Sequence, residues 1–117
     1  MADGTGMPYV VPVHFVFDGR RSHIYFHGRN NGKKLELMRV NGKVCFEIYE
    51  LLGIGLGEKD PCDSWTYYRS MVATGTAHIL ESREEKARGL KPLNQKYYKA
   101  APGEMPEKSI DATPSWK

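Results

Sequence analysis

The sequence predicts a mainly β, α+β domain, in which antiparallel strands forming a small barrel or sheet are interrupted by short helices. Three observations predict this class: segments rich in β-branched and aromatic residues, one segment of regular polar–apolar alternation, and two segments of helix-forming residues. The 117 residues fit a single domain. A chain of this size can bury a core without a disulfide or a structural metal.

The first two predicted strands form a hairpin. Pro8 to Asp18 is rich in valine and aromatic residues, which favours a strand. Pro12 has no backbone N–H, so we expect an edge or a bulge there. A turn beginning at Asp18 leads into a second strand, His23 to His27.

A loop and a short helix follow this hairpin. Gly28 to Gly32 contains residues that tolerate positive φ, and Lys33 to Val40 contains helix formers. Asn31 is a candidate N-cap, and Asn41 with its following glycine is a typical helix end.

The next part of the chain is predicted to be β. Lys43 to Glu50 alternates, with Val44, Phe46 and Ile48 on one face, so it is a strand. The glycine-containing segment Leu51 to Ser64 is expected to be a loop. Trp65 to Glu81 is expected to be one long strand or two, with Gly75 marking a bulge.

The second helix is predicted from a capping box at Ser82, which has glutamate three residues later. We expect this helix to span Arg83 to Tyr98, with a kink or break at Pro92. Residues 100–117 contain three prolines and few apolar residues, which indicates a loose tail beyond a compact part of about 8–98.

Composition and charge exclude several classes of protein. The net charge of +3 is too small for the dense basic stripe of a typical nucleic-acid-binding protein. No apolar run is long enough to span a membrane, and Met1 is not followed by a signal-peptide pattern, so we expect a cytoplasmic protein. Cys45 and Cys62 are then reduced thiols, and two cysteines alone cannot hold zinc.

Three ordered motifs carry a family resemblance. They are Pro8-Tyr9-Val10-Val11-Pro12-Val13; Ile24-Tyr25-Phe26-His27-Gly28 followed by Gly32-Lys33-Lys34-Leu35; and Val44-Cys45-Phe46-Glu47 followed by Tyr68-Arg69-Ser70-Met71-Val72 with Gly75 and Ala77. Over about residues 4–98, this set resembles the 5-nitroimidazole-resistance branch of the pyridoxamine 5'-phosphate oxidase-like group.

The resemblance implies a split β-barrel that binds flavin mononucleotide (FMN) in a homodimer, with the flavin sites at the subunit interface. It implies reduction of nitro groups on imidazole drugs or of other small electrophilic substrates. It also places His27 beside the flavin ring, where a near-neutral pKa would suit proton donation as the catalytic role.

The candidate phosphate site is the segment Gly28 to Lys34. A glycine-containing loop that enters a helix start offers free N–H groups and a favourable dipole to an anion. Lys33 and Lys34 add charge, Arg29 could add a planar donor fork, and Gly28 and Gly32 complete the cofactor-binding candidates in this loop. Metal binding is not expected, because His23 and His27 would lie roughly 13 Å apart along a strand.

Further cofactor contacts are expected from two other segments. Val11, Pro12 and Val13 could lay backbone groups along the ring edge. Tyr68, Arg69 and Ser70, with Trp65 and Tyr67, are candidates to wall the site from either subunit of the dimer.

Relative to the family, the chain is expected to be shortened at both ends. A helix and a first strand usually precede the Pro8 segment, and a closing strand usually follows. An open barrel leaves unpaired sheet edges, so pairing with a partner copy is expected. Three functions stay open: a flavin-dependent reductase; a non-enzymatic protein that stores flavin or binds haem through His14, His27 or His78; and a non-catalytic relative with an interaction role.

Overall fold

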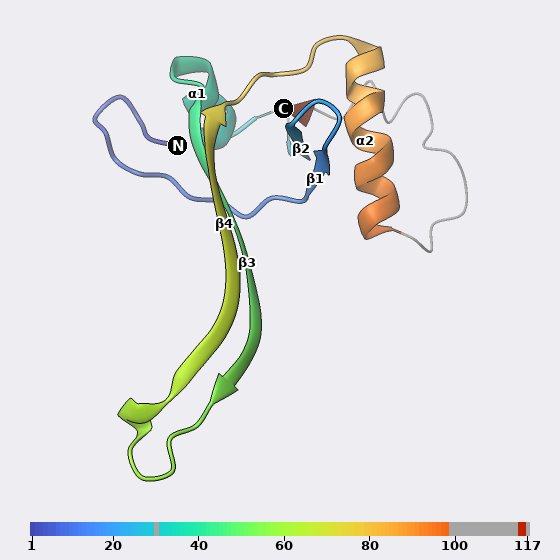
Figure 1. Ribbon diagram of the computed structural model, residues 1–117. Coiled ribbons are helices and arrows are strands. Elements are labelled where there is room, and N and C mark those ends of the chain that lie inside the picture. The colour runs from blue at the N-terminus through green and yellow to red at the C-terminus, as the bar shows by residue number, and fades with distance from the viewer. Residues whose placement is uncertain (30, 99–114, 117) are drawn as a thin grey trace. The chain divides into compact units, whose positions relative to one another are not determined.

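The computed structural model of the protein describes residues 1–29, 31–98 and 115–116 (Figure 1). Its elements in chain order are β1 (Phe15–Asp18), β2 (His23–His27), α1 (Lys33–Val40), β3 (Lys43–Gly55), a 3₁₀ turn η1 (Pro61–Asp63), β4 (Trp65–Thr76), α2 (Arg83–Tyr97) and β5 (Ser115–Trp116). The chain divides into two compact units. The first contains Met1–Lys43 and the described residues from Thr76 onward; the second is Val44–Gly75.

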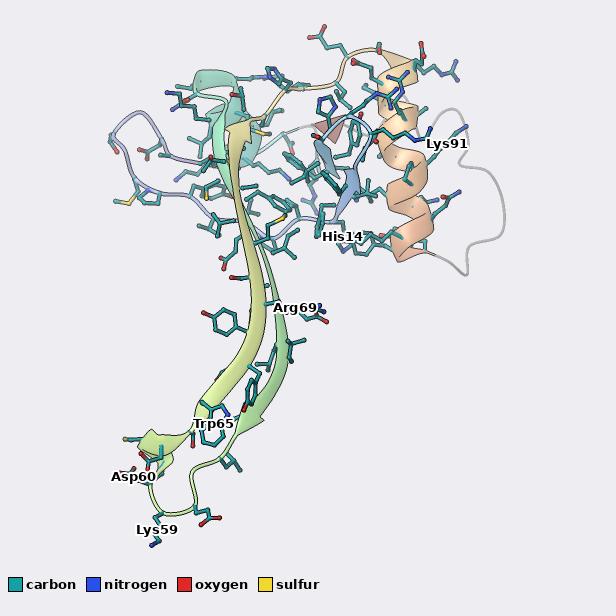
Figure 2. The ribbon with its side chains drawn as sticks, viewed as in Figure 1. His14, Lys59, Asp60, Trp65, Arg69 and Lys91 are labelled. Carbon is teal, nitrogen blue, oxygen red and sulfur yellow. The ribbon has the colours of Figure 1, made fainter. Side chains whose placement is uncertain are left out.

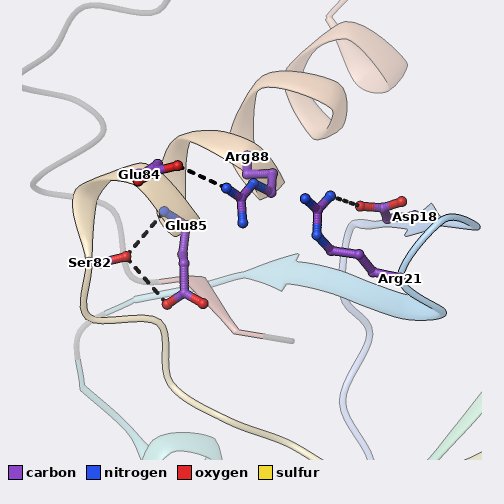
Figure 3. A network of polar contacts seen from close by, with 6 residues as sticks. All are labelled: Asp18, Arg21, Ser82, Glu84, Glu85 and Arg88. Atoms are coloured by element: carbon purple, nitrogen blue, oxygen red, sulfur yellow. Dashed lines mark hydrogen bonds and ion pairs between the residues drawn. The ribbon is translucent and has the colours of Figure 1, made fainter.

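The sheet of the first unit has the strand order β1-β2-β5, and both pairings are antiparallel. Phe15 lies opposite Phe26, and Asp18 lies opposite His23. The Asp18 carboxylate closes the hairpin by accepting a hydrogen bond from the Arg20 N–H at 3.0 Å. The same carboxylate pairs with the Arg21 guanidinium at 3.0 Å (Figure 3). These local contacts fix the register that brings the far ends of β1 and β2 together.

Helix α2 packs against this sheet through an apolar face. Leu90 and Leu93 on the helix and Tyr25 on β2 are each 3% exposed, which places the core of the unit between them. The helix can approach β2 closely because Gly89 has no side chain: a Cβ there would lie 2.8 Å from Tyr25 Cδ1. Ser82 caps the helix by accepting a hydrogen bond from the Glu85 N–H at 3.2 Å (Figure 3).

Helix α1 buries Leu35, Leu37 and Met38. Its N-cap is Gly32, which has a φ of 110° and no side chain with which to cap the first turn. The helix ends at Val40, and its C-cap is Asn41, whose N–H donates to the Leu37 carbonyl at 2.8 Å. The chain therefore enters α1 through a bare N-terminus and leaves it through an ordinary cap.

The second unit is a long two-stranded ribbon made by β3 and β4. Along β3, half-buried and exposed residues alternate from Val44 to Tyr49, as the sequence pattern predicts. The Trp65 indole lies where a Cβ on Gly55 would be, so the two residues pack across the strands. Asp60 caps the η1 turn at the tip by accepting a hydrogen bond from the Cys62 N–H at 2.8 Å (Figure 2).

The structure corrects three predictions about strands. Pro8 to His14 is not a strand; β1 begins only at Phe15, and Pro8 forms an isolated bridge with Ala2. The predicted loop from Leu51 is wrong in part, because β3 continues to Gly55, where Trp65 covers the glycine. Strand β4 ends at Thr76, short of the predicted Glu81.

The structure also corrects two predictions about helices, and it describes two residues of the predicted tail. Helix α2 continues through the exposed Pro92 to Tyr97, so of the predicted kink or break the break does not occur. Asn31 does not cap α1; Gly32 holds that position. Ser115–Trp116 pair with β2 as a short strand, and the rest of the predicted loose tail lies outside the described residues.

Candidate functional site

The candidate site of the first unit centres on His27, the last residue of β2. This side chain is half-buried, and its ring centroid lies 6.0 Å from that of His14. Burial lowers the pKa of His27 below its usual value of 6.5, and the nearby His14 and Lys34 lower it further. Both effects disfavour a charged imidazole, so His27 is biased toward its neutral form and releases a proton readily when it carries one.

Lys34 supplies the cation next to His27. Its side chain is half-buried, its ammonium lies 6.0 Å from the centroid of the Phe26 ring, and burial lowers its pKa. Lys33 is exposed, and its ammonium lies 5.3 Å from the centroid of the Tyr9 ring. The two lysines therefore have different settings: Lys34 lies against the core, and Lys33 lies over the N-terminal loop.

The loop between β2 and α1 completes the predicted phosphate segment. Gly28 is half-buried, Arg29 is exposed, and Gly32 caps the helix with a positive φ. A Cβ added to Gly32 would meet nothing within 4 Å, so the space beside the helix start is open. A group that ends in a phosphate needs amide donors and cations, and this segment presents both. The residues of Gly28 to Lys34 that the structure describes thus fit such a group.

Val11, Pro12 and Val13 precede β1 and are not part of a strand. Val11 and Val13 are half-buried, and Pro12 is exposed. Backbone groups outside a sheet ladder need other hydrogen-bond partners, and a ligand can be one, so losing the predicted strand does not remove their candidate role.

Tyr68, Arg69 and Ser70 lie on β4, in the second unit, and all three are exposed (Figure 2). Arg69 pairs across the ribbon with the Glu50 carboxylate at 2.6 Å. Both partners of this ion pair are well exposed, so its contribution to stability is small. Arg69 is thus occupied within its own unit, whereas the two neighbouring side chains project into solvent.

His14 and Tyr97 lie beside the candidate site, and the sequence interpretation named neither of them as a flavin-site residue; it named His14 only as a possible haem ligand. The two rings stack at 4.3 Å between centroids and 15° between planes. The pairing of the hairpin is a partial signal: Phe15 lies opposite Phe26, and the two histidines are the residues that adjoin this pair in the sequence. Tyr97, which comes from α2, could not be placed by any local pattern.

The described part of the chain contains neither a candidate metal centre nor a candidate membrane span. There, no group of three or more His, Cys, Asp or Glu side chains could hold a metal ion. No helix among the same residues is long and apolar enough to cross a membrane. Cys45 and Cys62 are exposed free thiols.

A protein-family model described as pyridoxamine 5'-phosphate oxidase matches residues 2–115. The chain belongs to this family. The match covers nearly the whole sequence and confirms the resemblance carried by the three motifs. No curated protein matches the chain.

Two solved structures relate this pyridoxamine 5'-phosphate oxidase family member to known folds. One is a candidate 5-nitroimidazole antibiotic resistance protein from Bacteroides thetaiotaomicron, with 26% identity and a TM-score of 0.74 over 98% of this chain. The other is the flavocytochrome Anf3 from Azotobacter vinelandii, with 21% identity and a TM-score of 0.72 over 98% of this chain. The chain spans 66% of the first structure's length and 53% of the second's. The second likeness is one of fold alone.

Within this family fold, the site offers two kinds of chemistry. The start of α1 with Lys33 and Lys34 can hold an anion, and His27 can give up or accept a proton at a ring nitrogen. The group that can handle a proton, His27, and the helix start that can bind an anion are thus only a few residues apart in the sequence.

Proposed function

We propose that this family member binds FMN and acts as a flavin-dependent reductase of nitroimidazole-type or other small electrophilic compounds. One observation carries the proposal: β2 ends in the half-buried His27, and the chain then returns as an open helix start bearing Lys33 and the half-buried Lys34. Family membership and the likeness to the Bacteroides resistance protein support the same conclusion.

The phosphate of FMN would lie at the start of α1. Gly32 leaves the first-turn amides without a side-chain cap, and Lys33 and Lys34 provide positive charge. Burial lowers the pKa of the half-buried Lys34 ammonium. A phosphate beside Lys34 would favour the charged form of that ammonium. Arg29 and the Gly28 backbone would add donors from the loop.

The ring end of the cofactor would lie along Val11, Pro12 and Val13, next to His27. FMN supplies the two-electron reduction when it is bound. The role of the chain is to hold the ring, to admit a small substrate and to provide a proton from a His27 ring nitrogen to the reduced substrate. Closure of the split barrel, with Tyr68, Arg69 and Ser70 walling the site, belongs to the same proposal.

The proposal includes a homodimer. A two-stranded ribbon is marginal in water by itself, yet the second unit carries a set of large apolar side chains that are at least 48% exposed. They are Tyr49, Leu51, Leu52, Ile54, Leu56, Trp65, Tyr67, Tyr68, Met71 and Val72. Exposed apolar surface on this scale typically marks an interface. A second copy that covers the ribbon would bring its own β4 residues to a shared site.

Comparing FMN with riboflavin tests the cofactor and its phosphate contact together, because the two ligands differ only in the phosphate. The purified protein would be mixed with each ligand, desalted, and its visible absorbance and flavin fluorescence recorded. We expect FMN to be retained in preference to riboflavin. The Lys33→Ala/Lys34→Ala variant should lose that preference, and the control Lys86→Ala/Lys91→Ala should keep it. Equal retention of both flavins by the parent protein would rule out the phosphate site, and a Soret band without flavin absorbance would point to haem.

The dimer is tested by light scattering during gel filtration. We expect twice the chain mass of 13.3 kDa. Tyr67→Glu, on the ribbon, should shift the mass toward one chain, whereas Val40→Glu, at a more exposed apolar position on α1, should not. A parent protein that stays monomeric at micromolar concentration would refute the shared site.

Reductase activity is tested by anaerobic loss of nitroimidazole absorbance with the FMN-loaded protein and a chemical reductant. His27→Gln should slow substrate loss while flavin retention stays unchanged. A variant with undiminished turnover would remove His27 from the reaction.

A further inference from the structure

The last turn of α2 contacts the chain just before β1 through several independent interactions. The Phe15 N–H donates a hydrogen bond to the Tyr97 hydroxyl at 3.2 Å, and the Lys96 ammonium donates to the Phe15 carbonyl at 2.9 Å. The same ammonium lies 3.6 Å from the centroid of the Phe15 ring. The end of the helix therefore holds both polar backbone groups of Phe15, on strand β1.

His14 precedes Phe15 and is fixed by the same helix end. Its ring stacks nearly parallel on Tyr97, at 4.3 Å between centroids and 15° between planes. The centroid of the His27 ring lies 6.0 Å from that of His14. His14 is thus held between a residue of α2 and the proposed proton donor at the end of β2.

We propose that Tyr97 and Lys96 are positioning residues, which hold the His14 imidazole beside His27 so that His14 sets the electrostatic environment of the proton-handling site. The proposal rests on the proposed function in giving His27 a chemical role. It goes further in assigning a second histidine and the end of α2 to the same site.

The groups that face His27 explain why His14 matters. Lys34 approaches from α1, His14 from the segment before β1, and Lys96 and Tyr97 lie beyond His14 at the end of α2. Among the described residues, the causes of the lowered pKa of His27 are burial and the two like charges of His14 and Lys34, and no carboxylate is among them. A change in the position of His14 should therefore change the proton affinity of His27.

The anchoring of α2 makes its last turn a firm support. Leu90 and Leu93 are each 3% exposed, and the Tyr98 N–H still donates to the Asn94 carbonyl at 2.8 Å. The helix is therefore held in the core one turn before Tyr97 and remains regular to its end. Tyr97 itself is 37% exposed, so replacing it should leave the fold intact.

The test follows the imidazole Cε1–H signal of His27 by NMR between pH 5 and pH 8, without flavin, and the signal is assigned with His27→Gln. We expect His14→Gln and Tyr97→Leu to shift the His27 midpoint upward, because each removes or displaces a like charge. Tyr97→Phe keeps the stacked ring and should stay closer to the parent. The matched control is Tyr98→Leu, at the adjacent exposed position, and it should leave the midpoint unchanged.

Two results would overturn the proposal. One is an unchanged His27 midpoint in His14→Gln, which would show that His14 does not act on His27. The other is an equal shift in Tyr97→Leu and Tyr98→Leu, which would reduce Tyr97 to general support of the helix end. Because the titration needs no cofactor, failure to bind FMN would refute the proposed function and leave this result standing. Should a Tyr97 variant not fold, His14→Gln still decides the outcome.

Discussion

Replacing Gly89 with alanine would add one methyl group, with two opposing effects on the stability of the fold. In a helix interior, alanine is more favourable than glycine by about 1 kcal/mol. At this position, however, the added Cβ would lie 2.8 Å from Tyr25 Cδ1, 2.9 Å from Cγ and 3.1 Å from Cβ. These are the inner atoms of a side chain that is only 3% exposed, so the ring cannot swing away.

The clash should outweigh the gain in helix propensity. Inserting a methyl group into a packed interior costs roughly 1–3 kcal/mol. Subtracting about 1 kcal/mol for propensity leaves a net loss of up to about 2 kcal/mol. The unfolding entropy of a chain of this length means that each kcal/mol of lost stability lowers Tm by about 4 °C. A loss of up to about 2 kcal/mol therefore predicts a fall in Tm of up to about 8 °C.

Urea unfolding followed by circular dichroism would measure the loss at several protein concentrations, so that any dimerisation is accounted for. The propensity contribution is measured separately, by comparing Gln95→Ala with Gln95→Gly at an exposed site on the same helix. Alanine should be the more stable at position 95 and the less stable at position 89. A Gly89→Ala protein that gains stability as position 95 does would show that α2 does not approach Tyr25 as described.

Two further predictions concern the helix cap and the charge at the site. Ser82→Ala should cost about 0.5–2 kcal/mol in urea unfolding, because the Glu85 N–H loses its acceptor, while Ser82→Asp should retain most of the stability. Stability should also fall as the pH drops below 6.5: the folded-state pKa of His27 lies below that value, so the unfolded chain takes up a proton that the folded chain resists. His27→Gln should show a flatter dependence, and an unchanged slope would assign the effect to other groups.

The elements that the sequence predicted well are those with local determinants. Strand β2 and helix α1 have the predicted bounds, and the capping box at Ser82 begins α2. In each case the evidence lies within a few residues: strand-forming side chains, helix formers before Asn41, or a hydroxyl three residues ahead of a glutamate. The family resemblance was confirmed for a related reason, since three motifs in a fixed order carry more information than any one of them.

The errors fall where distant residues decide the structure. Gly53 and Gly55 were taken as loop residues, but Trp65 on the facing strand covers Gly55 and extends the ribbon. The Pro8 segment has strand-like composition, yet β1 begins only at Phe15, whose backbone groups are held by Lys96 and Tyr97, more than eighty residues away in the sequence. Propensity describes a residue, whereas a strand requires a partner at the right register.

The same distinction explains the site. Spacing along the chain directed attention to His23 and His27, which lie on one strand and too far apart to act on one group. His27 instead lies beside His14: each adjoins one member of the Phe15–Phe26 pair in the sequence, and their ring centroids lie 6.0 Å apart. The Asp18 contacts hold the turn of the hairpin, and the turn fixes which residues of β1 and β2 lie opposite each other along both strands. The turn at Asp18 and the end of α2 at Tyr97 therefore constrain the same pair of histidines from opposite ends of β1, and a change at either should be measurable at His27.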